Sequence, residues 1–277
     1  MSQVTKEYFK KKAPDYDNVD SQYYWVFSDE LLWHLLTSQQ FLPSSKESPF
    51  RFIDLGAGTG RWTFKILLAY PRARAFLIDQ SAEMLEVASR KLKKFSTEDR
   101  AEIEIEDLQN LDRLEKAPFD YALCLHNVIG FFSDAESLLK NLFDKMKKGG
   151  KVAAMFPSVY HAIYFCNACR KKEEIDRIIE EKRVKYNDDM PSIRVFEIEE
   201  IEPLIAECGF KNTRFYGFPV TIYPKSTETL IEGSTKELSD LLTDLPYREK
   251  LLSVEKRLCV NPRNAPRGNN LLVVFEK

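Results

Sequence analysis

Phe52-Ile-Asp-Leu-Gly-Ala-Gly-Thr-Gly60 is the stretch that decides the fold of this chain, and Arg61-Trp-Thr-Phe-Lys65 follows it directly. A short apolar run contains Asp54, and glycines come after it at alternate positions. This pattern predicts a buried strand that turns tightly into the N-terminus of a helix. Glycine permits positive φ there and lets a ligand approach the backbone more closely than a Cβ atom would allow. We therefore expect a nucleotide-like ligand on this turn.

Two further acidic positions follow predicted strands of the same sheet. Residues 74–78 are strand-like and are followed by Asp79, at a distance from the glycine turn that suits a hydrogen bond to ribose hydroxyls. Residues 101–106 alternate small or apolar with charged side chains, and Asp107-Leu108 comes next. An aspartate there can reach an exocyclic amine while the leucine packs on a purine. The glycine pattern alone is less specific, because nicotinamide and flavin enzymes also carry G-x-G-x-G after a strand.

With these residues together, the chain resembles the class I S-adenosylmethionine-dependent methyltransferases. The resemblance covers about residues 50–157 well and the remainder loosely. The acid two residues before the first glycine favours this family over dehydrogenases, which usually carry G-x-G-x-x-G without it. The resemblance implies that S-adenosyl-L-methionine is the cofactor. It also implies that the glycine segment holds the methionine part, Asp79 the ribose and Asp107 the adenine.

The expected cofactor-binding residues combine this segment with the strand ends and the N-terminal aromatics. Aromatic rings attract a sulfonium cation by about 0.5–2 kcal/mol each, which is why tyrosines of the N-terminal region are included. The predicted set is Asp54, Gly56, Ala57, Gly58, Thr59, Gly60, Asp79, Gln80, Met84, Asp107, Leu108, Leu125, Tyr16 and Tyr24.

The composition limits the class of protein. Hydrophobic residues make up 44% and charged residues 30%, as in ordinary globular enzymes. A net charge of -2 and a pI near 6.1 give no overall attraction to nucleic acid. The charged N-terminus and the absence of an apolar run of about 18 residues argue against a signal peptide or a membrane span, so a cytoplasmic protein is expected. Five cysteines are interpreted as packed thiols, and no metal is implied.

Strands and helices are predicted to alternate, which indicates an α/β fold with a parallel sheet covered on both faces. The resemblance implies a seven-stranded, doubly wound, Rossmann-like sheet whose last strand is antiparallel, with a helical cap. Predicted strands are 51–55, 74–79, 101–106, 119–125, 151–156, 211–217 and 270–276. Predicted helices are about 60–70, 81–95, 134–147 and 196–210, with a further helical stretch at 160–185.

Four regions are expected along the chain. Residues 1–48 form an N-terminal helical lid, with a helix over 28–36 capped by Ser28-Asp29, and residues 49–157 form the cofactor-binding core. Residues 158–210 form a helical cap segment. Residues 211–277 supply the last two strands, with an insertion at about 218–268 that contains helices at 227–245 and 247–258 and a structured turn at 261–268. A connection this long is usually functional, so substrate specificity is expected in the cap.

His126 is the candidate general base, because it follows the predicted strand 119–125 and so reaches the ligand edge of the sheet. A histidine that only hydrogen-bonds substrate or backbone is an equally good interpretation. His161 is the second candidate. Polar and aromatic groups that could contact the acceptor are Asn127, Phe131, Tyr160, His161, Arg194, Tyr216, Tyr223 and Arg267. Arginines that brace the surface or a loop are the favoured interpretation, and an arginine at the acceptor would suit a carboxylate.

The leading hypothesis is methyl transfer from S-adenosylmethionine to an oxygen, nitrogen or carbon atom of a small molecule. One alternative is methylation of a macromolecule such as tRNA or protein. Another is non-methyl chemistry on S-adenosylmethionine, such as intramolecular cyclisation of its aminobutyryl chain. Oligomeric state and acceptor identity are left open.

Overall fold

The central feature of the fold is a seven-stranded sheet with the order β3-β2-β1-β4-β5-β9-β8. The computed structural model describes residues 3–115, 118–223 and 241–277. Six strands run parallel, and β9 is antiparallel to both of its neighbours. The strands are β1 (Phe50–Leu55), β2 (Ala73–Asp79), β3 (Ala101–Ile105), β4 (Phe119–Cys124), β5 (Met146–Phe156), β8 (Lys211–Phe218) and β9 (Asn270–Glu276).

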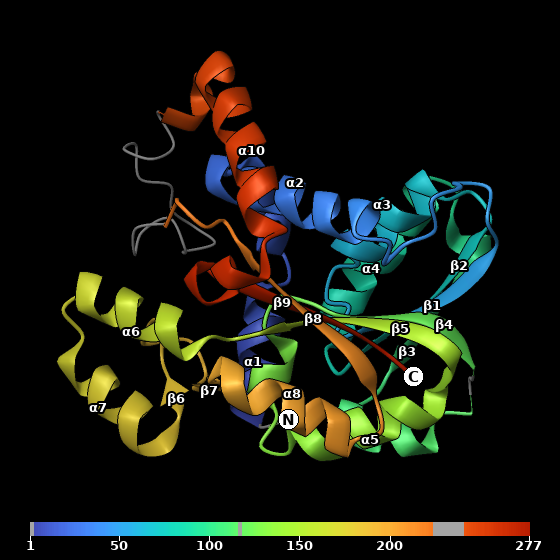
Figure 1. The fold of residues 1–277 in the computed structure, drawn as a ribbon. Coiled ribbons are helices and arrows are strands. Elements are labelled where there is room, and N and C mark those ends of the chain that lie inside the picture. Colours follow the sequence, from blue (N-terminus) through green and yellow to red (C-terminus); the bar gives the residue numbers. More distant parts are fainter. Residues whose placement is uncertain (1–2, 116–117, 224–240) are drawn as a thin grey trace.

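Helices cover both faces of this sheet (Figure 1). On one face lie α2 (Tyr23–Ser38), α3 (Arg61–Ala69), α4 (Ala82–Lys94) and α10 (Leu245–Cys259). On the other lie α5 (Ala135–Lys145) and α8 (Ile198–Glu207), with the short 3-10 helix η3 (Leu108–Arg113). The sheet side chains alternate between two apolar clusters. For example, Phe52 joins the first cluster and its neighbour Ile53 joins the second, and both are fully buried.

A third apolar cluster lies beyond the carboxyl ends of the strands. It is built by α6 (Val159–Ala168), α7 (Lys172–Glu181), β6 (Arg183–Val184) and β7 (Ile193–Arg194), which form a lobe beside the sheet (Figure 1). Phe9 of α1 (Gln3–Lys12) packs on this cluster and meets the ring of Phe131 edge to face at 5.3 Å. The N-terminal helix and the lobe therefore approach each other over the edge of the sheet where ligands bind in doubly wound folds.

The predicted alternation of strands and helices is confirmed, and so is the antiparallel last strand. The helix predicted at 247–258 is α10, and the turn at 261–268 is the 3-10 helix η6 (Pro262–Arg267). The helix predicted at 227–245 falls mostly on residues 224–240, outside the described part of the chain. The helical stretch predicted at 160–185 consists of two helices, α6 and α7, and the helical part ends at Glu181 because β6 begins at Arg183.

The predicted cap at Ser28-Asp29 is also wrong. Helix α2 begins five residues earlier, at Tyr23, with Gln22 at the N-cap position. Ser28 is buried inside the helix, where its hydroxyl accepts a hydrogen bond from the Asn270 side chain at 3.2 Å. Ser28 therefore serves a tertiary contact to β9 and does not cap a helix.

Candidate active site

The glycine turn after β1 adopts the conformation that its sequence predicts. Gly56, Gly58 and Gly60 all have positive φ, at 65°, 54° and 70°. A Cβ on Gly56 would lie 2.7 Å from a methyl group of Val128, whereas a Cβ on Gly58 would meet no protein atom within 4 Å. Gly56 and Gly58 therefore serve different purposes. Gly56 is required by protein packing, and Gly58 leaves open space in front of the backbone.

Asp79 at the end of β2 fixes the shape of this turn. Its carboxylate accepts hydrogen bonds from the backbone N–H of Gly58 and of Ser81, both at 2.9 Å. Burial raises the pKa of Asp79, and these backbone hydrogen bonds oppose the rise. The residue predicted to bind ribose is thus already held in place by the loop, as a preorganised ligand should be.

Asp54 lies deeper, at the end of β1. It is 4% exposed, and its carboxylate accepts a hydrogen bond from the Thr63 hydroxyl at 2.6 Å. Burial raises the pKa of Asp54 to about 7, and the neighbouring charge of Asp79 adds to the rise. A cationic group bound nearby would stabilise the ionised forms of both carboxylates.

A cavity opens in front of the turn, and most of the predicted cofactor residues lie on its wall. These are Asp54, Gly56, Ala57, Gly58, Thr59, Asp79, Gln80, Met84, Leu125 and Tyr16. The remaining wall residues are Phe9, Arg61, Trp62, His126, Val128 and Phe131. We call this space the cofactor cavity. The sequence did not single out Phe9 or Arg61, because neither lies in a recognisable motif.

Four predicted cofactor residues do not lie on this wall. Gly60 packs against α4, since a Cβ there would lie 3.2 Å from that of Ala88. Leu108 is buried in the apolar cluster on the other face of the sheet. Asp107 caps η3 by accepting a hydrogen bond from the backbone N–H of Gln109 at 3.0 Å. Tyr24 is 1% exposed in the core, where its hydroxyl accepts a hydrogen bond from the Asn269 amide.

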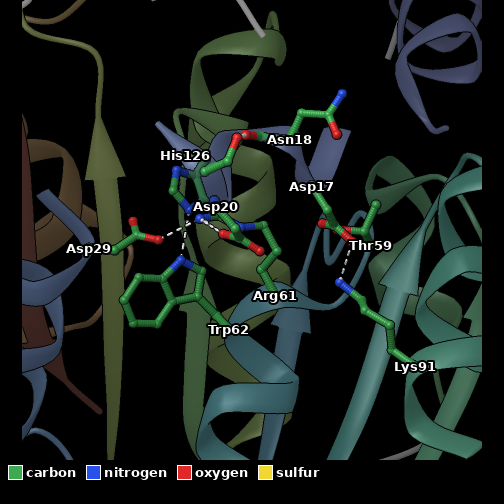
Figure 2. A network of polar contacts seen from close by, with 10 residues as sticks. Asp17, Asn18, Asp20, Asp29, Thr59, Arg61, Trp62, Lys91 and His126 are labelled. Carbon is green, nitrogen blue, oxygen red and sulfur yellow. Dashed lines mark hydrogen bonds and ion pairs between the residues drawn. The ribbon is translucent and has the colours of Figure 1, made fainter. Parts of the chain in front are cut away.

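Residues Tyr16–Ser21, the 3-10 helix η1, are attached to the glycine turn by a polar network (Figure 2). Asp17 accepts hydrogen bonds from the Thr59 hydroxyl at 2.6 Å and from the Lys91 ammonium group at 2.8 Å. These partners belong to the turn and to α4. The N-terminal segment therefore lies over the cofactor cavity, held by side chains from the core.

Arg61, the first residue of α3, is the centre of the second half of this network (Figure 2). Its guanidinium donates to Asp20 at 2.6 and 2.9 Å and to Asp29 at 2.5 Å, and its side chain is only 9% exposed. Burial acts to lower the pKa of Arg61, but the two carboxylates raise it overall. Burial also raises the pKa of Asp29, against the effect of Arg61. The arginine thus joins η1 and α2 to the start of α3.

His126 follows β4 with a φ of 52°, and Asn127 follows with 63°, so the chain bends sharply here. The indole N–H of Trp62 donates a hydrogen bond to Nε2 of His126 at 2.7 Å (Figure 2). A neutral imidazole whose Nε2 accepts a hydrogen bond carries its proton on Nδ1. Burial, with a smaller effect from the charge of Arg61, lowers the pKa of His126 to about 3. This arrangement favours a neutral, hydrogen-bonding histidine over a general base.

His126 is expected to stay neutral from about pH 8 down to about pH 5, because a pKa lowered from the usual value near 6.5 keeps the proton off Nε2 until stronger acid. The measurement is a ¹H–¹⁵N titration of protein labelled at histidine, with assignment by His126→Asn. Nε2 should show the shift of an unprotonated, hydrogen-bonded nitrogen throughout. A protonation midpoint near pH 6.5 would contradict this arrangement.

A second, larger cavity adjoins the cofactor cavity. The two share five wall residues, namely Phe9, Tyr16, Arg61, His126 and Phe131. The other wall residues are Tyr8, Lys12, Val19, Trp25, Asn127, His161, Phe165, Tyr186, Asn187, Asp189, Met190, Asn269 and Asn270. We call this space the acceptor cavity. Aromatic rings dominate its wall.

Three of the predicted substrate residues, Asn127, Phe131 and His161, lie on the wall of the acceptor cavity. Burial lowers the pKa of His161 to about 4. Its ring is surrounded by those of Phe165, Tyr186 and Tyr223, at centroid distances of 6.2, 5.9 and 6.5 Å. Sequence reasoning missed Trp25 and Asn269 as wall residues. Trp25 belongs to an aromatic cluster that fits helix packing equally well, and Asn269 lies in no motif.

The other predicted substrate residues are placed elsewhere. Tyr160 is exposed and donates a hydrogen bond to Glu199 at 3.3 Å, and Tyr216 is buried in the core of the sheet. Arg194 pairs with Glu200 at 3.4 Å and lies over the Phe196 ring. Tyr223 donates to the backbone carbonyl of Arg267, whose own side chain lies outside the cavity wall. The predicted arginine partners for a carboxylate are therefore not at the acceptor cavity.

The described residues contain neither a membrane-spanning helix nor a cluster of metal ligands. No helix among residues 3–115, 118–223 and 241–277 is long and apolar enough to cross a bilayer. Within the same part of the chain, no group of three or more His, Cys, Asp or Glu side chains could hold a metal ion. All five cysteines are free thiols.

Comparisons with known proteins agree with this geometry. A family model described as a methyltransferase domain matches residues 53–152. Malonyl-[acyl-carrier protein] O-methyltransferase 1 of Ilyobacter polytropus is 28% identical over 57% of this chain and 52% of its own length. Trans-aconitate 2-methyltransferase of Pseudomonas paraeruginosa is 34% identical over 43% of this chain and 40% of its own. The chain thus spans about half the length of the curated relatives it matches.

A solved structure resembles the whole chain. It is a SAM-dependent methyltransferase from Thermotoga maritima, described as a possible histamine N-methyltransferase. The two are 18% identical, with a TM-score of 0.57, and the alignment covers 99% of each chain. At this identity the likeness establishes the fold alone.

Proposed function

The chain belongs to the class I S-adenosylmethionine-dependent methyltransferases, and from that premise we propose that it methylates a small molecule held in the acceptor cavity. The observation that carries the proposal is the shared wall of the two cavities. A methyl donor in one cavity and an acceptor in the other would meet at Phe9, Tyr16, Arg61, His126 and Phe131. Holding two reactants in this way supplies much of the rate of a bimolecular transfer.

S-adenosylmethionine is the cofactor. The cofactor cavity fits it, because Gly58 leaves open the space that any Cβ would enter and because Asp79 is already oriented by backbone hydrogen bonds. We assign the ribose to Asp79 and the adenine to Gln80 and Met84. We assign the methionine part to the glycine turn with Asp54. Asp107 lies outside the cavity wall, so we do not keep it as the adenine ligand.

The electrophilic methyl group comes from the sulfonium of the cofactor, and the chain supplies position and surroundings. Aromatic rings at the shared wall suit a sulfonium cation. Burial raises the pKa of Tyr16 to about 12, and burial lowers that of His126 to about 3. The shared wall therefore offers no group that titrates near neutral pH. This favours an acceptor atom that is nucleophilic without a strong protein base, such as an unprotonated nitrogen.

We propose corresponding roles for the four regions of the chain. Residues 1–48 act as the lid over the cofactor cavity, supported by the contacts of Asp17 and Asp20 to the core. Residues 49–157 hold the cofactor. Residues 158–210 complete the acceptor cavity, supported by His161 and Tyr186 on its wall, and residues 211–277 contribute Asn269 to the same wall.

The product distribution tests the proposed reaction. Purified protein, S-adenosylmethionine and a small-molecule extract are expected to give S-adenosylhomocysteine, because a methyl transfer leaves the demethylated cofactor. The readout is chromatography with mass detection, and heat-denatured protein is the control. Methylthioadenosine without S-adenosylhomocysteine would instead indicate cyclisation of the aminobutyryl chain. Product only with added tRNA or protein would support methylation of a macromolecule.

A further inference from the structure

Three residues on the wall of the acceptor cavity each carry one buried polar atom that has no hydrogen-bond partner among the described residues. The atoms are Nε1 of Trp25, Nδ1 of His161 and Oδ1 of Asn269. Buried polar groups in folded proteins are nearly always hydrogen-bonded, and exceptions call for a specific explanation. Because all three residues lie on the wall of one cavity, a molecule bound there is the simplest explanation.

Neighbouring contacts hold these atoms in place. The Asn269 amide donates through Nδ2 to the Tyr24 hydroxyl, and its backbone N–H donates to the carbonyl of Pro219 at 3.0 Å. Asn269 is 9% exposed, so its Oδ1 is a fixed and desolvated acceptor. The Trp25 ring meets those of Tyr24 and His126 edge to face, at 5.6 and 6.5 Å. Trp25 thereby presents a fixed donor beside the shared wall.

The charged side chains on the wall are of both signs, so they do not favour an acceptor of either charge. Arg61 reaches the wall, but two carboxylates already bind its guanidinium. Lys12 and Asp189 have opposite charges, and Asp189 lies at an exposed position. Burying an ion without a counter-ion is strongly unfavourable. An uncharged molecule avoids that cost.

The aromatic residues on the wall favour a planar acceptor. Phe9, Trp25, Phe131, Phe165 and Tyr186 all contribute rings to the cavity. Edge-to-face pairs order several of them, including Phe9 with Phe131 and Phe165 with Tyr186 at 5.1 Å. Planar molecules gain most from such surfaces because aromatic rings pair by offset stacking or edge contacts.

We propose that the acceptor is an uncharged aromatic or heteroaromatic molecule that accepts a hydrogen bond from Trp25 Nε1 and donates one to Asn269 Oδ1. His161 Nδ1 supplies a third polar contact. This assignment rests on the proposed methyl transfer and adds the class of acceptor and the residues that select it. Trp25, Asn269 and His161 then determine specificity without taking part in the chemistry.

Three matched probes test the assignment by calorimetry on the full chain saturated with S-adenosylhomocysteine. 2-Quinolone is uncharged and carries both an N–H donor and a carbonyl acceptor. 1-Methyl-2-quinolone lacks the donor, and quinoline-2-carboxylate is an anion of similar size. We expect 2-quinolone to bind at least about 10-fold more tightly than either, because a site built to hydrogen-bond a ligand discriminates against analogues that leave its groups unpaired.

Variants then identify the contacts. Trp25→Phe keeps a ring but removes the donor, and should weaken 2-quinolone binding by about 5- to 10-fold, as expected for one net hydrogen bond. Asn269→Leu should abolish the preference for 2-quinolone over its N-methyl derivative. Trp33→Phe is the matched control, because Trp33 lies on the same helix but not on the cavity wall. His161→Phe provides an additional variant if either of the first two fails to bind S-adenosylhomocysteine.

Tighter binding of quinoline-2-carboxylate, no binding of any uncharged probe, or a Trp25→Phe variant equal to wild type would each overturn the assignment. The proposed methyl transfer would survive any of these results if a charged acceptor is methylated. Failure of the wild-type protein to bind S-adenosylhomocysteine would instead overturn the proposed function itself, and the acceptor assignment with it. Titration of S-adenosylhomocysteine alone separates the two cases.

Discussion

Replacement of Arg61 by methionine should lower the free energy of unfolding by about 3 kcal/mol, the lower end of the range for removing one partner of a buried ion pair. Arg61 binds two carboxylates with a side chain that is 9% exposed, and Asp29 is 17% exposed. Without the guanidinium, Asp29 must either remain a buried, unpaired anion or take up a proton. The same change should weaken cofactor binding, because Arg61 connects η1 to the wall of the cofactor cavity.

Urea unfolding followed by circular dichroism measures the stability effect. Arg90→Met is the matched control, since Arg90 forms an exposed pair with Glu86 at 3.7 Å and should change stability by less than about 1 kcal/mol. Adding Asp29→Asn to Arg61→Met should restore part of the lost stability by removing the unpaired charge. If Arg61→Met and Arg90→Met had equal free energies of unfolding, the Arg61 contacts to Asp20 and Asp29 would not stabilise the fold as we expect.

Gly58→Ala is expected to weaken S-adenosylmethionine binding by about 5- to 150-fold, corresponding to the 1–3 kcal/mol typical of an overpacked site. The new methyl group would meet no protein atom within 4 Å. It would instead occupy the open space in front of the turn, where we place the methionine end of the cofactor. The backbone cost of positive φ for alanine is about 1–2 kcal/mol and applies to protein stability rather than to binding.

Gly149→Ala isolates that backbone cost. Gly149 has a φ of 77° and also has open space around it, but it lies near the start of β5 and not on the wall of the cofactor cavity. Both variants should lose similar stability in thermal or urea unfolding. Only Gly58→Ala should lose affinity when the cofactor is titrated by calorimetry, so equal affinities would remove the glycine turn as the cofactor site.

Local patterns explain why the sheet could be predicted from sequence. The apolar run that ends at Leu55 and the positive-φ glycines are consecutive in sequence, and Asp79 ends the next strand. Each of these features predicts local structure with little dependence on distant residues. The start of α2 was harder to predict. Ser28 and Asp29 look like a cap, yet in the fold Ser28 accepts a hydrogen bond from Asn270, far away in sequence.

The acceptor cavity depends on contacts that no local pattern reveals. Its wall combines α1, η1, α2, the bend after β4, the lobe of α6 to β7 and the start of β9. Arg61 meets Asp29 across 32 positions, and Trp62 meets His126 across 64. The sequence could therefore suggest His126 but neither its hydrogen bond to Trp62, which fixes the tautomer, nor the burial that lowers its pKa. Likewise, Arg194 looked available for a carboxylate until the structure paired it with Glu200.

A crystal structure with bound S-adenosylhomocysteine tests the central claim most directly. We expect the nucleoside in the cofactor cavity, with Asp79 contacting its ribose. The sulfur should face the space between Tyr16, His126 and Phe131 that opens into the acceptor cavity. A nucleoside bound elsewhere would contradict the account. So would a sulfur atom separated from the acceptor cavity by protein.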